Sequence, residues 1–492
     1  TLYLNEDSYE FSNEYRAREV LEKYCSFMPV PIYLNNEKAE PQYETIEKDE
    51  LTDKDTIIET IVEPAKTEEK ENEKGEKETV ETEPAREKYK ILKRPVALND
   101  TTPLWSKHPN ECTDEEYRDF YRKVFHDYKE PLFWIHLNMD YPFNLKGILY
   151  FPKINTEYDS IEGTIKLYNN QVFIADNIKE VIPEFLMLLK GAIDCPDLPL
   201  NVSRSALQND GFVKKISDYI TKKVADKLSG MCKTDRENYE KYWDDIAPFI
   251  KFGCIKDEKF AEKMNDYILF KNLDGKYLTL KDCLEENKEK HENTVFYVTD
   301  EKEQSQYINM FKKEGLDAVI LPHSIDSPFI GHLEQKNEGL KFLRIDADLN
   351  STFKEEVKDD DEEFKKTSET LTETFKKALG NDKLEIKVEK LKDESISSML
   401  TVSEETRRMQ DMMKMYNMYG MDSSMFGGQE TLVLNLNNKL VQYVLANKEG
   451  DLTKLVCEQL YDLAVITHRQ LTPEEMTKFV ARSNEIMMEM TK

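Results

Sequence analysis

Long apolar runs, paired cysteines and a leader sequence are all missing from this chain. No stretch of about 18 apolar residues is present, so no membrane-spanning helix is expected. The first residues, TLYLNEDSYE, lack the basic and apolar parts of a signal peptide. The seven cysteines are far apart and form no CxxC pair, which disfavours a disulfide framework and a zinc site. We therefore expect a soluble, cytoplasmic protein with mostly buried thiols.

Common catalytic and nucleotide-binding motifs are also missing. The sequence contains no GxxxxGK[ST], no GxGxxG after a strand, no HExxH and no GxSxG. The seven histidines are isolated, so no metal site is expected. Lysine and arginine number 69 against 97 aspartate and glutamate, and the net charge of −28 repels phosphate backbones. Nucleic acid is therefore not an expected partner, and a self-sufficient nucleotide site is not visible.

The 492 residues exceed what one hydrophobic core normally serves, so two or three folded units are expected. Residues 1–35 combine the strand-like TLYL and VPIYL with a helical pattern between them. Residues 36–95 are expected to form a flexible charged linker, because 37–83 carry 18 acidic and 7 basic residues. Such a linker is either a solvated spacer or a specific acidic binding site.

From residue 96 the pattern becomes that of an α/β protein. Strands are expected at GILYFP and as a hairpin around Asn169-Asn170, and the apolar residues 181–193 are expected to form a buried helix. Residues 96–233 form this larger α/β unit, 234–270 a helical connector, and 271–342 a smaller α/β unit. The fold class is therefore multidomain α/β and α+β.

Residues 343–492 are expected to form a mixed part that ends in a helical bundle. Thr472, Pro473 and Glu475 give the last helix an N-cap, a proline at its first position and a capping box. Two helices, 451–467 and 472–490, carry apolar stripes that are too wide for a lone hairpin to cover. A two-fold four-helix bundle is the natural solution. The candidate interface residues are Leu455, Leu460, Leu463, Phe479 and Ile486.

The stretch PDLPLNVSRSALQ contains the most interesting charge, Arg204. A guanidinium on a short loop anchored by Leu198, Leu200 and Val202 matches a phosphate bidentately. The alternative is an arginine that pairs with a nearby acid at the start of a helix. Gln208 follows one helical turn later.

Two further features could bind partners. Seven of the 18 methionines fall between residues 409 and 425. They serve either core or dimer packing, or an adaptable surface for varied partners. Trp105 follows the linker and is either an anchor within the fold or a contact for partners.

Several separate stretches, in order, carry a family resemblance: PLWSKHP, DEEYRDFYRKVFHDYKEPLFWIH, GILYFP, IKLYNNQVFIAD and LPLNVSRSALQ. Together they closely resemble the middle domain of the heat shock protein 90 chaperones, most of all the bacterial HtpG type. The resemblance runs along the whole chain. It implies that residues 1–35 are the end of an ATP-binding N-terminal domain, 96–342 an αβα middle domain, and 343–492 a C-terminal dimerisation domain. We therefore expect a fragment of a longer protein.

The resemblance also implies site residues. Arg204 would reach the γ-phosphate of ATP, with Gln208 and Asn201 beside it. The family usually has glutamate after this arginine, where the chain has Ser205. The implied client-binding residues are Trp105, Phe329, Met409, Met412, Met415 and Tyr416. ATP and Mg²⁺ would be bound mainly by the N-terminal domain, so no cofactor is expected in this chain.

The implied function is that of an ATP-dependent, homodimeric chaperone that remodels unfolded or partly folded client proteins. The seventy-kilodalton heat-shock chaperone system is a further partner that the resemblance allows. The chain alone is expected to be inactive as an ATPase. Two alternatives remain: a nucleotide-independent holdase or scaffold in which Arg204 is structural, and a metabolic α/β enzyme, which the lack of a convergent catalytic set disfavours.

Overall fold

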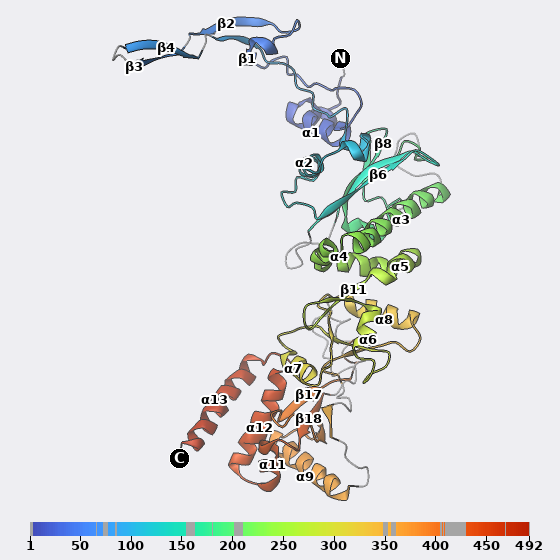
Figure 1. Cartoon of the computed structure of the whole chain (residues 1–492), viewed down its shortest axis with the longest axis vertical. Helices are drawn as coiled ribbons and strands as arrows, with labels where there is room; N and C mark the ends of the chain where they lie inside the picture. Colours follow the sequence, from blue (N-terminus) through green and yellow to red (C-terminus); the bar gives the residue numbers. More distant parts are fainter. Residues whose placement is uncertain are drawn as a thin grey trace. The chain divides into compact units, whose positions relative to one another are not determined.

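The computed structural model is shown in Figure 1 and divides into two compact units, Thr1–Lys153 with Ser160–Asp218, and Ile154–Asp159 with Tyr219–Lys492. The structure describes residues 3–64, 66–71, 77–83, 86–153, 163–179, 181–200, 210–347, 353–355, 361–403, 406, 408, 430–467 and 469–491. Among these residues, no helix has the length and apolar character needed to cross a bilayer. The fold class predicted from the sequence, multidomain α/β and α+β, is confirmed.

The centre of the first unit is a five-stranded sheet with the order β6-β7-β10-β8-β9. Its strands are β6 (Phe133–Met139), β7 (Leu145–Phe151), β8 (Ile165–Asn169), β9 (Val172–Asp176) and β10 (Lys190–Asp194). The central strand β10 pairs antiparallel with β7 and parallel with β8. The predicted hairpin is confirmed, because β8 pairs with β9 and both Asn170 and Gln171 adopt the positive φ of a tight hairpin turn.

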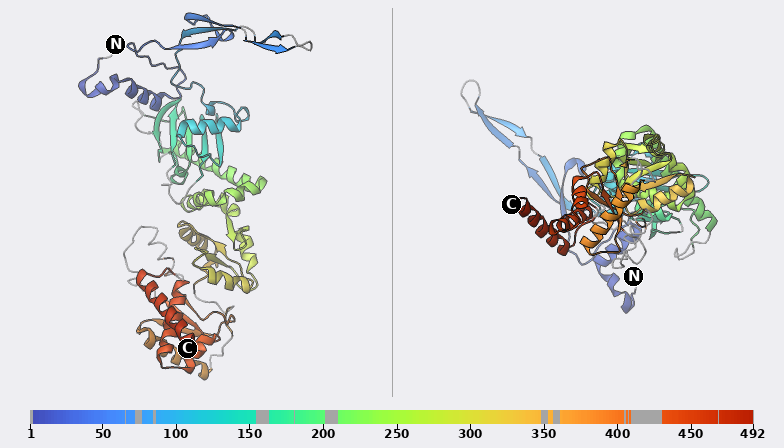
Figure 2. Two further views of the ribbon diagram at one scale, coloured as in Figure 1. Left: turned by 90° about the vertical axis from the view of Figure 1, so that its left-hand side faces the viewer. Right: turned by 90° about the horizontal axis from the view of Figure 1, so that it is seen from below.

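An aromatic core lies between this sheet and helix α2 (Asp114–Phe125), which covers one face of the sheet (Figure 2). Thr113 and Glu116 form a capping box at the start of α2. Phe27, which follows α1 (Glu14–Cys25), packs in this core with its ring centroid 4.6 Å from that of Trp105. The helix predicted within residues 1–35 is thus confirmed, whereas the strand-like segments on either side of it form no strand in residues 3–35.

Residues 181–193 correct the prediction of a buried helix. They form a short 3-10 helix, η5 (Glu184–Leu188), followed by β10. A continuous apolar run does not distinguish a buried helix from a strand covered on both faces. Here pairing with two neighbouring strands decides the outcome, and a Cβ at Gly191 would lie only 2.6 Å from Leu149 Cδ2. A side chain at this position would therefore require the Leu149 side chain to move.

Residues 36–95 also differ from the expected flexible linker. They contain a three-stranded antiparallel sheet, order β1-β5-β2, and a hairpin of β3 and β4. The bounds are β1 (Tyr43–Glu47), β2 (Ile57–Glu63), β3 (Lys66–Glu71), β4 (Lys77–Glu83) and β5 (Arg86–Leu92). Opposite charges face each other across strands, as where Lys88 Nζ lies 3.0 Å from Glu63 and 3.9 Å from Glu47. The amino-acid composition of residues 36–95 does not reveal that these charges pair across strands.

Arg94 closes the base of this sheet, and its removal is expected to loosen it. Its Nε and Nη2 atoms donate to the Asp55 carboxylate at 2.8 and 2.6 Å, and this pairing holds the pKa of Asp55 well below its usual range. Arg94→Ala should therefore increase proteolytic cleavage in residues 48–56 severalfold, whereas Lys93→Ala, which leaves the pair intact, should not. Because the pKa of Asp55 is depressed, acidification below about pH 4 should weaken this contribution progressively in the parent chain. Equal cleavage of the Arg94→Ala and Lys93→Ala chains would contradict this role.

The helix after the predicted arginine loop is α3 (Asp210–Thr234), and its predicted stripe of Val213, Ile216, Ile220 and Val224 is buried. The predicted helical connector is confirmed as α4 (Arg236–Lys256) and α5 (Glu258–Met264). In the second unit a five-stranded sheet has the order β12-β11-β14-β13-β15. Its strands are β11 (Leu269–Asn272), β12 (Tyr277–Thr279), β13 (Thr294–Val298), β14 (Val319–Ile320) and β15 (Lys341–Arg344).

The helices of this sheet are α6 (Leu280–Glu286), α7 (Ser305–Lys313) and α8 (Asp326–Lys336). A second, three-stranded sheet has the order β16-β18-β17. Its elements and the remaining helices are α9 (Glu362–Leu379), β16 (Glu385–Glu389), β17 (Ser398–Thr401), β18 (Thr431–Asn435), α11 (Lys439–Ala446), α12 (Asp451–Ile466) and α13 (Pro473–Met490). Helix α7 joins the two sheets, since Tyr307 and Phe311 share one core with Met399 and Val433.

Candidate functional site

The loop that carries the predicted phosphate-binding arginine begins at the carboxyl end of β10. The Asn169 side-chain amide donates to the carbonyls of Cys195 and Pro196 at 3.0 and 2.9 Å. Asp197 accepts a hydrogen bond of 2.7 Å from the backbone of Asn144. Leu198 is buried, as the sequence predicts. Both neighbouring strands therefore fix the start of this loop at the end of the central strand.

Asn201, Arg204 and Gln208 themselves lie outside the described residues, as do Val202 and Ser205. Their contact with a phosphate stays a prediction. The same holds for the predicted client-binding residues Met409, Met412, Met415 and Tyr416. Among the described residues, no group of three or more His, Cys, Asp or Glu side chains is placed to hold a metal ion.

Arg408 lies directly before the Met-rich segment and is tied to helix α8. Its Nη1 and Nη2 atoms donate to the two carboxylate oxygens of Glu334 at 2.6 and 3.0 Å, and Nη2 also donates to the Phe342 carbonyl at 2.9 Å. Glu334 in turn accepts from the Phe342 backbone at 2.7 Å. This bidentate pair fixes the start of the predicted client segment against the smaller α/β unit. Sequence reasoning missed it, although an arginine pair next to a methionine cluster was its signal.

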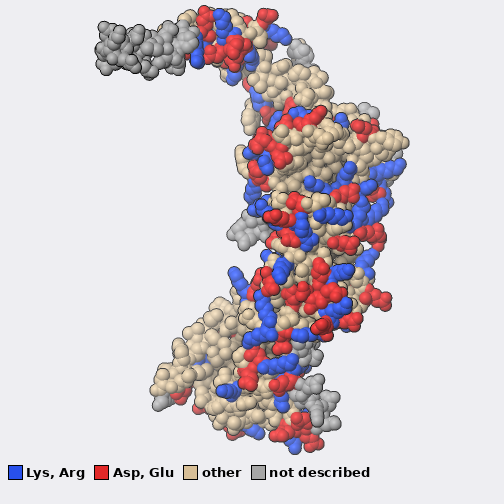
Figure 3. Space-filling view, viewed as in Figure 1, with Lys and Arg blue, Asp and Glu red and all other residues tan. Residues whose placement is uncertain are grey.

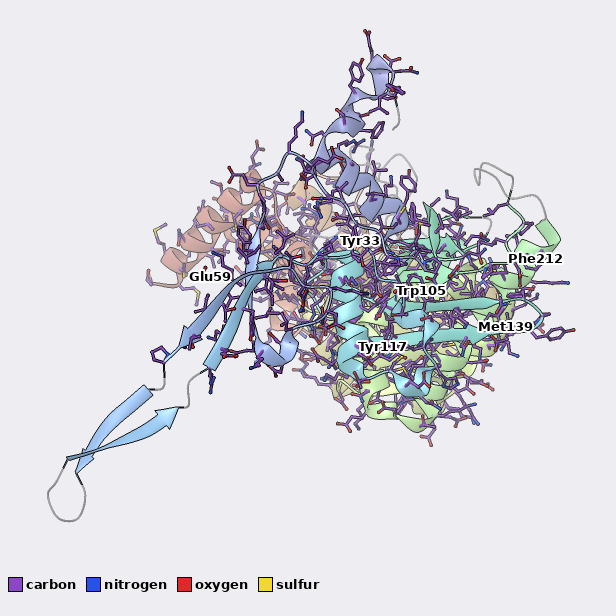
Figure 4. All side chains as sticks on the ribbon, turned by 90° about the horizontal axis from the view of Figure 1, so that it is seen from above. Tyr33, Glu59, Trp105, Tyr117, Met139 and Phe212 are labelled. Carbon is purple, nitrogen blue, oxygen red and sulfur yellow. The ribbon has the colours of Figure 1, made fainter. Side chains whose placement is uncertain are left out.

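Trp105 and Phe329 lie in the interior of their units. Trp105 is 1% exposed and belongs to the same aromatic cluster as Tyr117 (both labelled in Figure 4). Burial raises the pKa of Asp194, while hydrogen bonds from the Gln171 amide and the Trp105 indole oppose this rise. Phe329 is fully buried in α8, with its ring centroid 5.9 Å from Lys251 Nζ. Both side chains are therefore anchors of the fold in this conformation, and neither is available to a client.

The predicted interface residues differ in their exposure. Leu463 is exposed, while Leu455, Phe479 and Ile486 are half-buried. Leu460 is buried in the core formed by α9, α12 and the three-stranded sheet, so it is a core residue of its own chain. The exposed apolar residues of the two last helices are Leu452, Leu463, Ile466, Met476, Val480, Met487, Met488 and Met490. Ile466, Met488 and Met490 were not among the residues singled out from the sequence.

Helix α13 is held to α12 by polar groups. Arg482, 9% exposed, is the one buried residue of α13, and its Nη2 lies 2.5 Å from Asp462 and its Nε 3.4 Å from Glu458. The predicted capping box of Thr472 and Glu475 is confirmed. Arg469, with the Thr472 backbone, lowers the pKa of Glu475 to about 2. In Figure 3 the surface over α13, at the lower left, consists mostly of uncharged side chains.

Comparison with known proteins identifies the family. A family model described as Hsp90 protein matches residues 10–492. The chain belongs to the Hsp90 family.

Within that family the chain is similar to bacterial proteins named HtpG. Chaperone protein HtpG of Bacteroides thetaiotaomicron is 38% identical over 462 residues, which cover 91% of this chain and 61% of that protein. HtpG of Bacteroides fragilis is 37% identical over 482 residues, covering 95% and 64%. HtpG of Porphyromonas gingivalis is 34% identical over 471 residues, covering 92% and 62%. The chain thus spans about three fifths of the length of the curated relatives it matches.

Proposed function

We propose that this chain is the middle and C-terminal part of an ATP-driven, homodimeric chaperone that binds and remodels unfolded or partly folded proteins. The proposed dimer rests on one observation. Helix α13 buries only Arg482 in its own chain and exposes Met476, Val480 and Met487. A second copy of the chain would cover these side chains in a four-helix arrangement. Membership of the Hsp90 family supports the chaperone activity.

The ATP and Mg²⁺ of the proposed reaction would be held mainly by a domain that precedes residue 1. From this chain, Arg204 would complete the site at the γ-phosphate, with Asn201 and Gln208 beside it. The fixed start of their loop supports this role, because a guanidinium positioned in advance loses little freedom on binding phosphate. Bound ATP would favour closure of the dimer and would supply the phosphoryl group that is hydrolysed.

The client surface is proposed to be the Met-rich segment that follows Arg408. Thioether side chains adapt to varied partners at little cost, and the ion pair between Arg408 and Glu334 links this surface to α8. Trp105 and Phe329 are not part of the proposed surface, since both are buried. The seventy-kilodalton heat-shock system stays a further proposed partner.

Arg204→Ala in the full-length protein tests the ATP-driven function. The loss of charge-assisted hydrogen bonds to the phosphate should lower ATP turnover about 10- to 100-fold. This is less than the effect of an arginine finger in faster phosphoryl-transfer enzymes, because closure is expected to limit turnover. Turnover is measured by phosphate release under saturating ATP.

Lys214→Ala is the matched control, since it removes an exposed positive charge from the start of α3. Its turnover should equal that of the parent protein. An unchanged rate for Arg204→Ala would instead support a nucleotide-independent holdase in which this arginine is structural. This chain alone should neither bind nor hydrolyse ATP. Saturable ATP binding measured by calorimetry would contradict the proposal that a preceding domain holds most of the nucleotide site.

A further inference from the structure

A cavity of about 340 Å³ lies at one end of the five-stranded sheet in the second unit. It is lined by residues that directly follow β13, including Thr299 and Asp300, and by His323 and Ser324, which follow β14. Arg344, the last residue of β15, also lines it. All three strands are parallel, so the cavity lies at their common carboxyl edge. Its volume falls in the range of small-molecule sites, about 300–1,000 Å³.

The topology places this cavity where open α/β sheets bind ligands. From β13 the chain passes through α7 to β14 on one side, and then through α8 to β15 on the other side of β13. Because right-handed crossovers in opposite directions leave a sheet on opposite faces, the loops after β13 and β14 separate and leave a crevice. Most of the residues that line the cavity come from these two loops and from the adjoining α8.

Asp326 and Arg344, which line the cavity, each belong to a buried ion pair. Lys251 and Asp326 form one, with their side chains 3% and 4% exposed. Arg344 and Asp346 form the other, with 2.9 Å between Arg344 Nε and Asp346 Oδ1. Burying such pairs costs desolvation energy that their attraction rarely exceeds, so stability alone does not explain them. A polar ligand in the cavity would interact with the charged side chains of Asp326 and Arg344.

The charges differ between the mouth and the interior. Asp300 and Glu303 are exposed at the mouth, and Asp300 is held in place by hydrogen bonds from the backbone of Lys302 and Glu303 at 2.8 and 3.0 Å. Arg344 and His323 lie further in. The His323 Nδ1 atom is buried and has no hydrogen-bond partner among the described residues. The lining therefore offers exposed carboxylates outside, and inside it the ion-paired Asp326, the Arg344 guanidinium and the His323 ring.

We propose that this cavity binds a small zwitterion of the α-amino acid class, with its ammonium group at Asp300 and Glu303 and its carboxylate at Arg344. The carboxylates at the mouth select a cationic group. The planar guanidinium of Arg344, oriented by Asp346, suits a carboxylate, and the hydroxyls of Ser324 and Ser327 complete a polar lining.

The test is titration of the chain with each common L-amino acid by calorimetry at millimolar concentrations. At least one should bind saturably with one site per chain, and its decarboxylated and deaminated analogues should bind at least about tenfold more weakly. Glu303→Gln should weaken binding about tenfold or more. Glu301→Gln is the matched control, because Glu301 is an equally exposed neighbour that does not line the cavity.

Ser327→Leu provides a second variant, since the larger side chain fills the cavity and should abolish binding. Far-UV circular dichroism verifies that both variants fold. Failure of every amino acid to bind would overturn the proposal. Binding that persists unchanged in folded Glu303→Gln and Ser327→Leu chains would place the ligand elsewhere and overturn it as well.

Discussion

Replacing Val480 and Met487 by glutamate is expected to convert the chain from a dimer into a monomer. The two side chains are 50% and 55% exposed and lie two turns apart on one face of α13. Covering a side chain of this size contributes about 1.5–3 kcal/mol, and a two-fold interface contains each position twice. The four added charges should therefore weaken association at least about a thousandfold. Sedimentation equilibrium over a range of protein concentrations measures this directly.

Lys478→Glu is the control for the added charge. Lys478 lies on the same helix but on the face away from Val480, so this variant should dimerise like the parent chain. Circular dichroism and the thermal transition should show that the Val480→Glu, Met487→Glu chain stays folded, because neither side chain is in the core. A chain that remains dimeric with both substitutions would show that α13 is not the interface.

The elements best predicted from the sequence are those with local signals. Helix α13 begins where Thr472, Pro473 and Glu475 indicate, since a capping box acts through its own backbone. The hairpin of β8 and β9 is predicted from Asn169-Asn170, and its turn lies one residue later, at Asn170 and Gln171, which both adopt positive φ. Neither feature depends on distant parts of the chain, and a single sequence is enough to identify it.

Elements that depend on tertiary contacts were predicted less well. Strand β10 lies in an apolar run that suits a helix equally well, and its pairing with β7 and β8 decides between the two. The strands of residues 36–95 pair through their backbones and place Lys88 near Glu63 on a neighbouring strand, which a count of acidic residues does not reveal. Both misjudgements arise because pattern and composition describe neighbours in sequence, whereas strands are stabilised by neighbours in space.

The residues of the candidate site also divide into those with a local sequence signal and those that depend on tertiary contacts. Leu198 anchors the arginine loop as its apolar character indicates. Trp105 could serve either the core or a partner, and only the rings around it, among them Phe27 and Phe120, show that it is a core residue. The ion pair of Arg408 with Glu334 joins residues 74 positions apart, so the arginine pair beside the methionine cluster does not reveal which acidic residue it meets.

Lys251→Met is expected to destabilise the second unit by about 3–5 kcal/mol. The substitution keeps most of the side-chain volume next to Phe329 but leaves the Asp326 carboxylate buried without its cation. Asp326 also accepts a hydrogen bond of 2.9 Å from the His323 backbone, so its local geometry should persist while its charge becomes uncompensated. Hydrogen exchange in peptides of α4 and α8, followed with urea, measures the loss in this unit separately from the first.

The double variant Lys251→Met, Asp326→Asn distinguishes an unpaired charge from a packing defect. Asparagine still accepts from His323 but carries no charge, so most of the lost stability should return. Lys241→Met, on the exposed side of α4, should change stability by no more than about 0.5 kcal/mol. If the single and double variants lose the same stability, the destabilisation arises from altered packing around Phe329. A larger loss in the single variant shows that the ion pair is kept because one buried charge requires the other.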